Sequence, residues 1–186
     1  MSLNSFENFE ATPATAALGA EVAGIDLKRP LPESARSELR SALNQYQVLF
    51  FRDQYLDDEA QLGLAGCFGE PEVHPIRRAL GDPSVLHDIV DTEESEPDRD
   101  GWHTDVTYME RPPAAAVLRC EVTPIAGGDT LWANMHLAYE KLSDEMKIYL
   151  SNLRGLHATD GGFVDYIQNH LPADAAAKVM KAIGSG

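Results

Sequence analysis

Apolar residues recur at helical spacing in the segment LPESARSELRSALNQYQ, residues 31–47. They share one face of a helix with 3.6 residues per turn, at Ala35, Leu39, Ala42, Leu43 and Tyr46. This pattern predicts an amphipathic helix that buries one side. Periodicity and capping residues predict further helices over residues 57–71, 136–142, 144–153 and 172–184.

Two of these helices carry sequence signals at their ends. Asp58 and Gln61 stand at capping-box spacing, and Gly69 with Pro71 forms a stop signal for the same helix. Ser143 is placed to cap the helix that follows it. We therefore expect both helices to begin at these acidic or hydroxyl side chains.

Short apolar runs between Gly- and Pro-rich turns have the length of β-strands. The predicted strands cover residues 20–27, 47–52, 84–91, 114–122, 129–135 and 154–160. Residues 92–100, TEESEPDRD, form a polar, charged loop. Helices lie mostly ahead of and behind the strands, so the pattern indicates an α+β domain built on a sheet.

Length and composition narrow the class of protein. A chain of 186 residues with 44% hydrophobic residues is long enough for one globular domain, which we expect to span 1–186. The net charge of −15 argues against nucleic-acid binding, which depends on Lys and Arg. No apolar run approaches membrane-spanning length, and the N-terminus does not resemble a signal peptide. Cys67 and Cys120 are interpreted as buried free thiols, so we expect a cytoplasmic protein.

The segment GWHTDVTYMERPP, residues 101–113, contains candidate metal ligands. On a strand, residues i and i+2 point to the same face, so His103 and Asp105 would project side by side. Two histidines and one carboxylate form the facial triad of non-haem Fe(II) oxygenases. The pattern H-x-D alone is weak, and taken by itself it favours a surface turn in which Asp105 accepts from backbone N–H groups and His103 is solvated.

A second candidate lies in GGDTLWANM, residues 127–135. Gly127 and Gly128 permit a tight backbone turn. Thr130 follows on the next predicted strand, where its hydroxyl would be able to bond an anionic co-substrate. An ordinary strand threonine is the alternative interpretation.

Together these blocks resemble the TauD/TfdA family of Fe(II)- and 2-oxoglutarate-dependent dioxygenases, which are related to taurine dioxygenase and the alkylsulfatase dioxygenases. The resemblance rests on WHTDVT and GGDTLW in this order and spacing, and extends upstream through LGAEVAGIDLKRPL, YQVLFFRDQ and FGEPEVHP. It covers residues 18–160 approximately.

The resemblance implies a double-stranded β-helix (a cupin-like jelly roll) flanked by helices. It implies that His103 and Asp105 bind iron and that Thr130 contacts a carboxylate of 2-oxoglutarate. The implied reaction consumes O2 and 2-oxoglutarate, hydroxylates a small molecule, and releases succinate and CO2. Trp102 would line the pocket or belong to the neighbouring core. We expect no nucleic-acid or membrane partner, and a homo-oligomer for the whole protein.

Positions that contact substrate in taurine dioxygenases differ in part here. His74 stands where the family places a histidine that contacts the sulfonate. Arg77 replaces an expected tyrosine, Arg99 an expected asparagine, and Gly162 falls near an expected serine. These departures argue against taurine. They favour a larger anion, such as a sulfonate, sulfate ester or carboxylate, unless the arginines are solvated loop residues.

The resemblance also requires a distal histidine and an arginine for 2-oxoglutarate, and neither has a match in this sequence. None of His87, His136, His157 and His170 stands in a matching context. We therefore expect a fold truncated at its C-terminus and a chain that is inactive alone. Two other interpretations stay open: a non-catalytic fragment or binding module, and, with fewer ligands than usual, a metal hydrolase.

Overall fold

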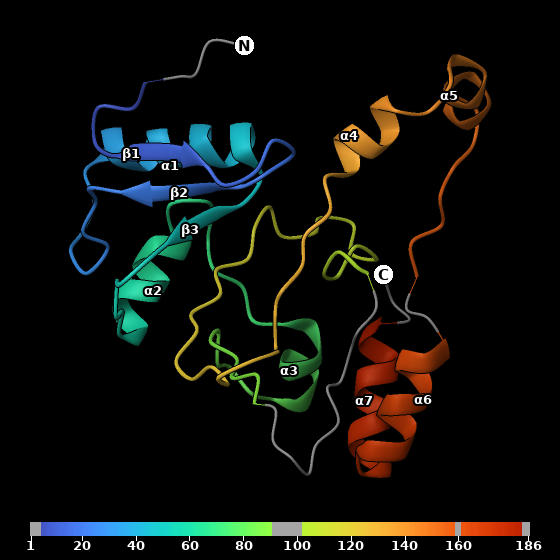
Figure 1. Cartoon of the computed structure of the whole chain (residues 1–186). Coiled ribbons are helices and arrows are strands. Elements are labelled where there is room, and N and C mark those ends of the chain that lie inside the picture. The colour runs from blue at the N-terminus through green and yellow to red at the C-terminus, as the bar shows by residue number, and fades with distance from the viewer. Residues whose placement is uncertain (1–4, 91–101, 159–160, 184–186) are drawn as a thin grey trace. The chain divides into compact units, whose positions relative to one another are not determined.

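The structure is a computed structural model that describes residues 5–90, 102–158 and 161–183. It divides into two compact units, which are treated separately. The first unit comprises Met1–Glu70 and Ala115–Arg154, and the second comprises Pro71–Ala114 and Gly155–Gly186. Figure 1 labels the helices and strands of both units.

The first unit is built on a small sheet of strand order β1-β2-β3. Strands β1 (Glu10–Pro13) and β2 (Ala20–Ala23) are antiparallel, whereas β2 and β3 (Leu49–Phe51) are parallel, with Val22 opposite Phe51. The sequence predicted β2 and β3 and did not predict β1. The central strand is the most buried, because β2 has neighbours on both edges.

Helix α1 (Glu33–Tyr46) connects β2 to β3 and lies across one face of the sheet (Figure 1). Its predicted apolar face is confirmed, since Ala35, Leu39, Ala42 and Tyr46 are buried. Leu39, Ala42 and Tyr46 belong to the core of the first unit. The other buried residues of this core are Phe9, Ala20, Val22, Leu27, Leu64 and Cys67. The helix ends where Gln47 adopts a left-handed conformation (φ 69°). This turn lets the chain return as a strand parallel to β2.

Helix α2 (Asp58–Ala65) begins one residue earlier than the capping pattern predicted. The cap is Asp57, whose carboxylate accepts a hydrogen bond of 2.8 Å from the N–H of Ala60. Asp57 has an extended backbone, which lets its side chain reach a free N–H of the first turn; Asp58 already belongs to the helix. The helix also ends before the predicted stop, at Gly66.

Residues 115–154 contain helices but none of the predicted strands. Helix α4 (Met135–Glu140) and helix α5 (Asp144–Ser151) are confirmed, and the Ser143 hydroxyl accepts a bond of 3.2 Å from Met146 N–H. The strands predicted over 114–122 and 129–135 are wrong in the described structure, where both segments are irregular up to α4. Strand formation requires a neighbouring chain to pair with, and these segments have none among the described residues.

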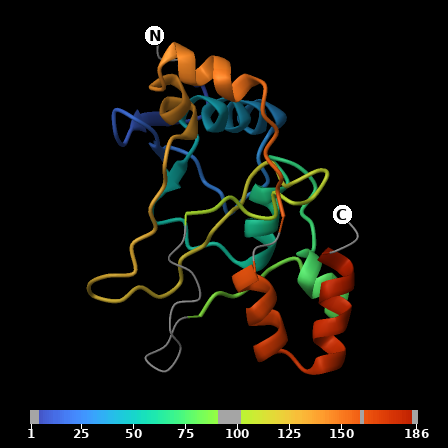
Figure 2. The same cartoon turned by 90° about the vertical axis from the view of Figure 1, so that its right-hand side faces the viewer.

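The second unit is a cluster of helices. Helices α6 (Gly161–His170) and α7 (Ala173–Ile183) lie side by side, and α3 (Pro75–Leu80) packs against α7 (Figures 1 and 2). Ile167, Ala176 and Val179 form its buried centre. The sequence predicted α7 and missed α3 and α6. The strands predicted over 84–91 and 154–160 are absent from 84–90 and 154–158, and their remaining residues lie outside the described ranges.

Candidate functional site

His103 and Asp105 meet at the start of a turn in the second unit. His103 Nε2 lies 3.3 Å from Asp105 Oδ1, so the two side chains are on one side of the chain, as predicted. The strand geometry from which this placement was argued is absent, because residues 102–104 are irregular and a turn runs over residues 105–108. The side chains are 55% and 69% exposed. A turn, rather than a pleated strand, therefore brings the pair together.

The donor set of this pair fits two neighbouring positions around a divalent metal ion. Such ions hold imidazole nitrogens and carboxylate oxygens at about 2.0–2.2 Å, so two adjacent ligands are about 3 Å apart. The observed 3.3 Å is close to that spacing. Within the described ranges, no group of three or more His, Cys, Asp or Glu side chains is placed to hold a metal.

Trp102 and His74 also belong to the second unit. Trp102 directly precedes the pair and is exposed. His74 is the N-cap of α3, where its Nδ1 accepts a bond of 3.3 Å from the N–H of Ile76. This contact orients the His74 ring at the first turn of α3. Arg99 lies outside the described residues, and Gly162 lies in the first turn of α6.

Arg77 holds a loop against α3. Its guanidinium donates to Asp82 Oδ2 at 2.8 Å and to the carbonyl of Leu86 at 3.0 Å, and its Nη1 lies 2.8 Å from His87 Nδ1. Hydrogen bonds from Ser84, followed by the Arg77 guanidinium, lower the pKa of Asp82 to about 2. The Arg77 side chain is 28% exposed. Its polar atoms are thus engaged within the loop itself.

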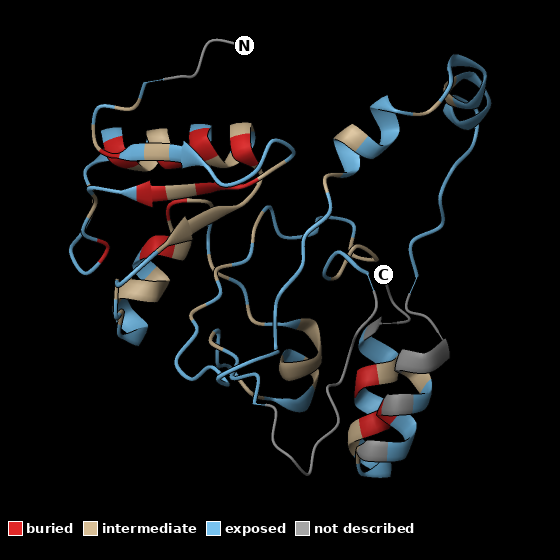
Figure 3. Cartoon of the chain, in the orientation of Figure 1, coloured by how far each residue is buried: buried red, intermediate tan, exposed pale blue. Residues whose placement is uncertain are grey.

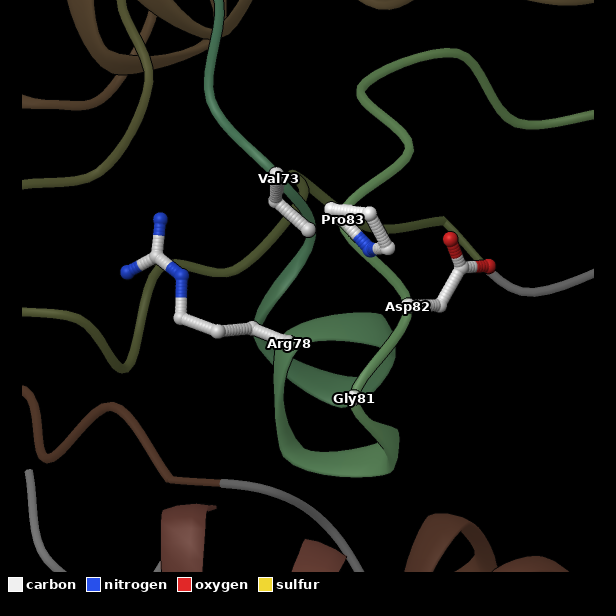
Figure 4. A pocket seen from close by; sticks show the side chains of 5 residues that line it. All are labelled: Val73, Arg78, Gly81, Asp82 and Pro83. Atoms are coloured by element: carbon white, nitrogen blue, oxygen red, sulfur yellow. The ribbon is translucent and has the colours of Figure 1, made fainter.

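A shallow hollow lies beside this loop (Figure 4). It has a volume of about 310 Å³ and is lined by Val73, Arg78, Gly81, Asp82 and Pro83. Figure 4 shows the side chains of Arg78 and Asp82 pointing to opposite sides of Val73 and Pro83. Arg78 was not among the residues predicted from the sequence. The pair of neighbouring arginines in HPIRR was the available signal.

Thr130 belongs to the first unit and is exposed. The turn before it is confirmed, since Gly127 and Gly128 have φ of 82° and 71°. After it, the Trp132 ring meets Phe50 of β3 edge-on at 5.3 Å, and Asn134 Nδ2 donates to the carbonyl of Ala17 at 2.6 Å. Thr130 is therefore held between a glycine turn and two contacts with the N-terminal part of its unit.

Comparison with known proteins assigns the chain to a family. The family model described as "Taurine catabolism dioxygenase TauD, TfdA family" matches residues 10–179. The chain belongs to the TauD/TfdA family. The resemblance seen in the WHTDVT and GGDTLW blocks is thereby confirmed. The family model is that of a dioxygenase, and two of the relatives are named as α-ketoglutarate-dependent dioxygenases.

Three similar proteins illustrate the extent of the match. An α-ketoglutarate-dependent sulfate ester dioxygenase of Pseudomonas putida is 34% identical over 80% of this chain and 49% of its own length. An alkylsulfatase of Acinetobacter baylyi is 32% identical over 91% of this chain and 53% of its own length. The crystal structure of a taurine dioxygenase from Burkholderia xenovorans is 38% identical, with a TM-score of 0.70, over 82% of this chain and 55% of that one.

The match covers only part of the length of each relative. The chain spans about half the length of the curated relatives it matches. Among the described residues, no helix is both long and apolar enough to cross a membrane.

Proposed function

We propose that the whole protein to which this chain belongs is an Fe(II)- and 2-oxoglutarate-dependent dioxygenase that hydroxylates a small anionic substrate. The observation that carries the proposal is the His103–Asp105 pair, with Nε2 and Oδ1 3.3 Å apart, inside the region that matches the family. Iron and 2-oxoglutarate, when bound, would supply the chemistry with O2 as the oxidant: one oxygen atom of O2 would convert the substrate C–H bond into a hydroxyl, and the other would enter succinate as 2-oxoglutarate loses CO2.

In this proposal the residues of the chain bind and orient the reactants. His103 and Asp105 supply two of the three protein ligands of the iron, and Trp102 forms part of the wall beside them. The Thr130 hydroxyl donates a hydrogen bond to a carboxylate of 2-oxoglutarate. A distal histidine and an arginine come from a segment equivalent to the part of the relatives that this chain does not match.

The same segment would complete a jelly roll around the site. Residues 115–154 carry many exposed apolar side chains: Leu118, Val122, Ile125, Leu131, Trp132, Met135, Tyr139, Met146, Ile148, Tyr149, Leu150 and Leu153. Exposed apolar surface of this extent is normally covered by other protein segments. Two stretches of this region, 114–122 and 129–135, have strand-like sequences, so we propose that they pair with strands of that segment.

We propose a substrate that combines an anionic group with an apolar body. The relatives include proteins named for a sulfate ester, an alkylsulfate and (S)-phenoxypropionate. His74, Arg77 and Arg99 are the candidate residues for the anionic group. Arg77 already bonds Asp82 and the carbonyl of Leu86, so in this proposal its role includes shaping the loop that borders the substrate.

The decisive experiment measures succinate release by the whole protein with Fe(II), 2-oxoglutarate and a panel of sulfate esters, sulfonates, aryloxy acids and taurine. We expect turnover of at least one anion with an apolar body, and little turnover of taurine. His103→Ala and Asp105→Ala should abolish turnover. Thr130→Ala should weaken the bond to 2-oxoglutarate by about 1.5–3 kcal/mol, seen as a higher half-saturating concentration. Thr130→Ser, which keeps the hydroxyl, is the matched control.

An alternative function for residues 1–186 alone is that of a non-catalytic fragment. The absence of a third metal ligand among the described residues favours this alternative for the isolated chain. We expect the isolated chain to bind Fe(II) weakly and to release no succinate. Calorimetric titration of Fe(II) under anaerobic conditions distinguishes the cases, because tight binding by residues 1–186 would contradict the two-ligand interpretation.

A further inference from the structure

Tyr108 ends the turn that begins at the candidate metal ligand Asp105. The turn runs over residues 105–108 and is continued by a hydrogen bond of 3.0 Å from Met109 N–H to the carbonyl of Val106. Val106 has a positive φ of 45°, which a β-branched residue rarely adopts. Such a backbone persists only where surrounding contacts hold it, so the contacts of this turn matter for the ligand pair.

The ring of Tyr108 supplies such a contact. It packs against the buried cluster of Ile167, Ala176 and Val179, which α6 and α7 contribute. Ile76 and Ala79 of α3 pack against the same cluster. Figure 1 and Figure 2 both show α3, α6 and α7 grouped together. The α6–α7 pair is thus a common support for the ligand turn and for the helix capped by His74.

The hydroxyl of Tyr108 does not take part in this support. It is buried and has no hydrogen-bond partner among the described residues, and burial raises the pKa of the phenol. A buried hydroxyl without a partner lowers stability, so the packing of the ring must outweigh that cost. The contact is therefore apolar in character, and a phenylalanine would make it equally well.

We propose that Tyr108 is a positioning residue for the metal pair: through its ring, the α6–α7 helices fix His103 and Asp105 relative to α3 and His74. This inference rests on the proposed function, because it assigns Tyr108 a role toward the metal that His103 and Asp105 would bind. It gives the segment Gly161–Ile183 a role at the metal site, although this segment carries none of the candidate ligands. It also distinguishes Tyr108 from other residues of the same cluster, which support the fold but are not on the ligand turn.

The test uses the whole protein with Co(II) as a spectroscopic substitute for iron. Tyr108→Phe and Tyr108→Ala are compared with Leu171→Ala, which removes a partly buried side chain from the same cluster away from the turn. Binding affinity and the visible spectrum of Co(II) report on the site, and the melting temperature reports on the fold. Tyr108→Leu replaces Tyr108→Ala in every comparison if the alanine variant does not fold.

We expect Tyr108→Phe to keep the Co(II) affinity and spectrum and to melt at the same or a higher temperature. Tyr108→Ala should weaken Co(II) binding by about tenfold or more, as expected for groups that orient metal ligands, and should alter the spectrum. Leu171→Ala should lower the melting temperature and leave the spectrum unchanged. Equal effects of Tyr108→Ala and Leu171→Ala on Co(II), or no effect of Tyr108→Ala, would overturn the positioning role.

Comparing Co(II) binding by the wild-type protein and by His103→Ala shows whether a failed test overturns the proposed function or only the role of Tyr108. Co(II) binding that does not depend on His103 would overturn both the metal site and the role of Tyr108. His103-dependent binding that survives Tyr108→Ala unchanged would overturn the role of Tyr108 alone.

Discussion

Residues 5–70 and residues 115–154 share the first unit but bury their apolar side chains very differently. The core residues of this unit all come from the first stretch, with Leu39 and Ala42 fully buried. From the second stretch only Val117 packs against that core. Val122 and Ile125 are 90% and 108% exposed, and Figure 3 shows α4 and α5 largely exposed.

The difference lies in the partners available and not in hydrophobicity. In the first stretch, α1 connects two strands that pair with one another, so an apolar helix face meets a sheet made by the same stretch. The second stretch has equally apolar segments, but its strand-like portions find no strand to pair with among the described residues. Local patterns therefore fold alone only when their partners lie nearby in the sequence.

The largest expected effect comes from removing a buried side chain of the first stretch. Leu39→Ala should reduce the free energy of unfolding by about 2–5 kcal/mol, because it leaves a cavity between α1 and the sheet. Leu118→Ala, the same change in the second stretch, should have an effect of about 0.5 kcal/mol or less. Urea denaturation followed by circular dichroism measures both. Similar losses for the two variants would contradict the contrast between the stretches.

The substitution Val122→Thr, which keeps the size and shape of the side chain, tests whether the second stretch becomes buried in the whole protein. Val122→Thr should not change the stability of residues 1–186, because this side chain is almost fully exposed. In the whole protein, a hydroxyl buried there without a partner should cost about 1–3 kcal/mol. The comparison uses denaturation of both proteins with and without the substitution. No loss in the whole protein would mean that strands do not cover this position.

The N-cap of α2 is expected to make a smaller contribution to the stability of the first stretch. Asp57→Ala should reduce stability by about 1 kcal/mol, because it removes the carboxylate that accepts from Ala60 N–H. Asp58→Ala is the control: it removes an exposed ion pair with Arg119 of the second stretch, so it should lower stability less than Asp57→Ala does. A larger loss from Asp58→Ala would show that this ion pair joins the two stretches more strongly than expected.

The smallest expected effect is electrostatic and belongs to the second unit. The pKa of Asp82 is lowered from 3.8 to about 2, by hydrogen bonds from Ser84 and then by Arg77. The folded state therefore favours the ionised carboxylate, so its contribution is present above about pH 4 and is lost as the pH falls through 2. Asp82→Asn should melt at a slightly lower temperature at pH 7 and converge with the wild type at low pH. An NMR titration giving an ordinary carboxyl pKa would contradict this.

The sequence by itself determined the family and most of the local elements. Helix α1, the Ser143 cap of α5 and the turn at Gly127 and Gly128 follow from periodicity and residue type, because their interactions join residues only a few positions apart. His103 and Asp105 were also recognisable as a pair, since only Thr104 stands between them in the sequence.

Only the tertiary structure decided which apolar runs become strands and what each candidate side chain contacts. The segments 114–122 and 129–135 resemble strands, yet pairing depends on distant residues that no local pattern contains. The sequence proposed Arg77 as a substrate residue, and only the folded chain showed that it also bonds Asp82 and the carbonyl of Leu86. Likewise, Tyr108 is joined to α6 and α7 across more than fifty positions, and contacts at that separation depend on the folded chain as a whole.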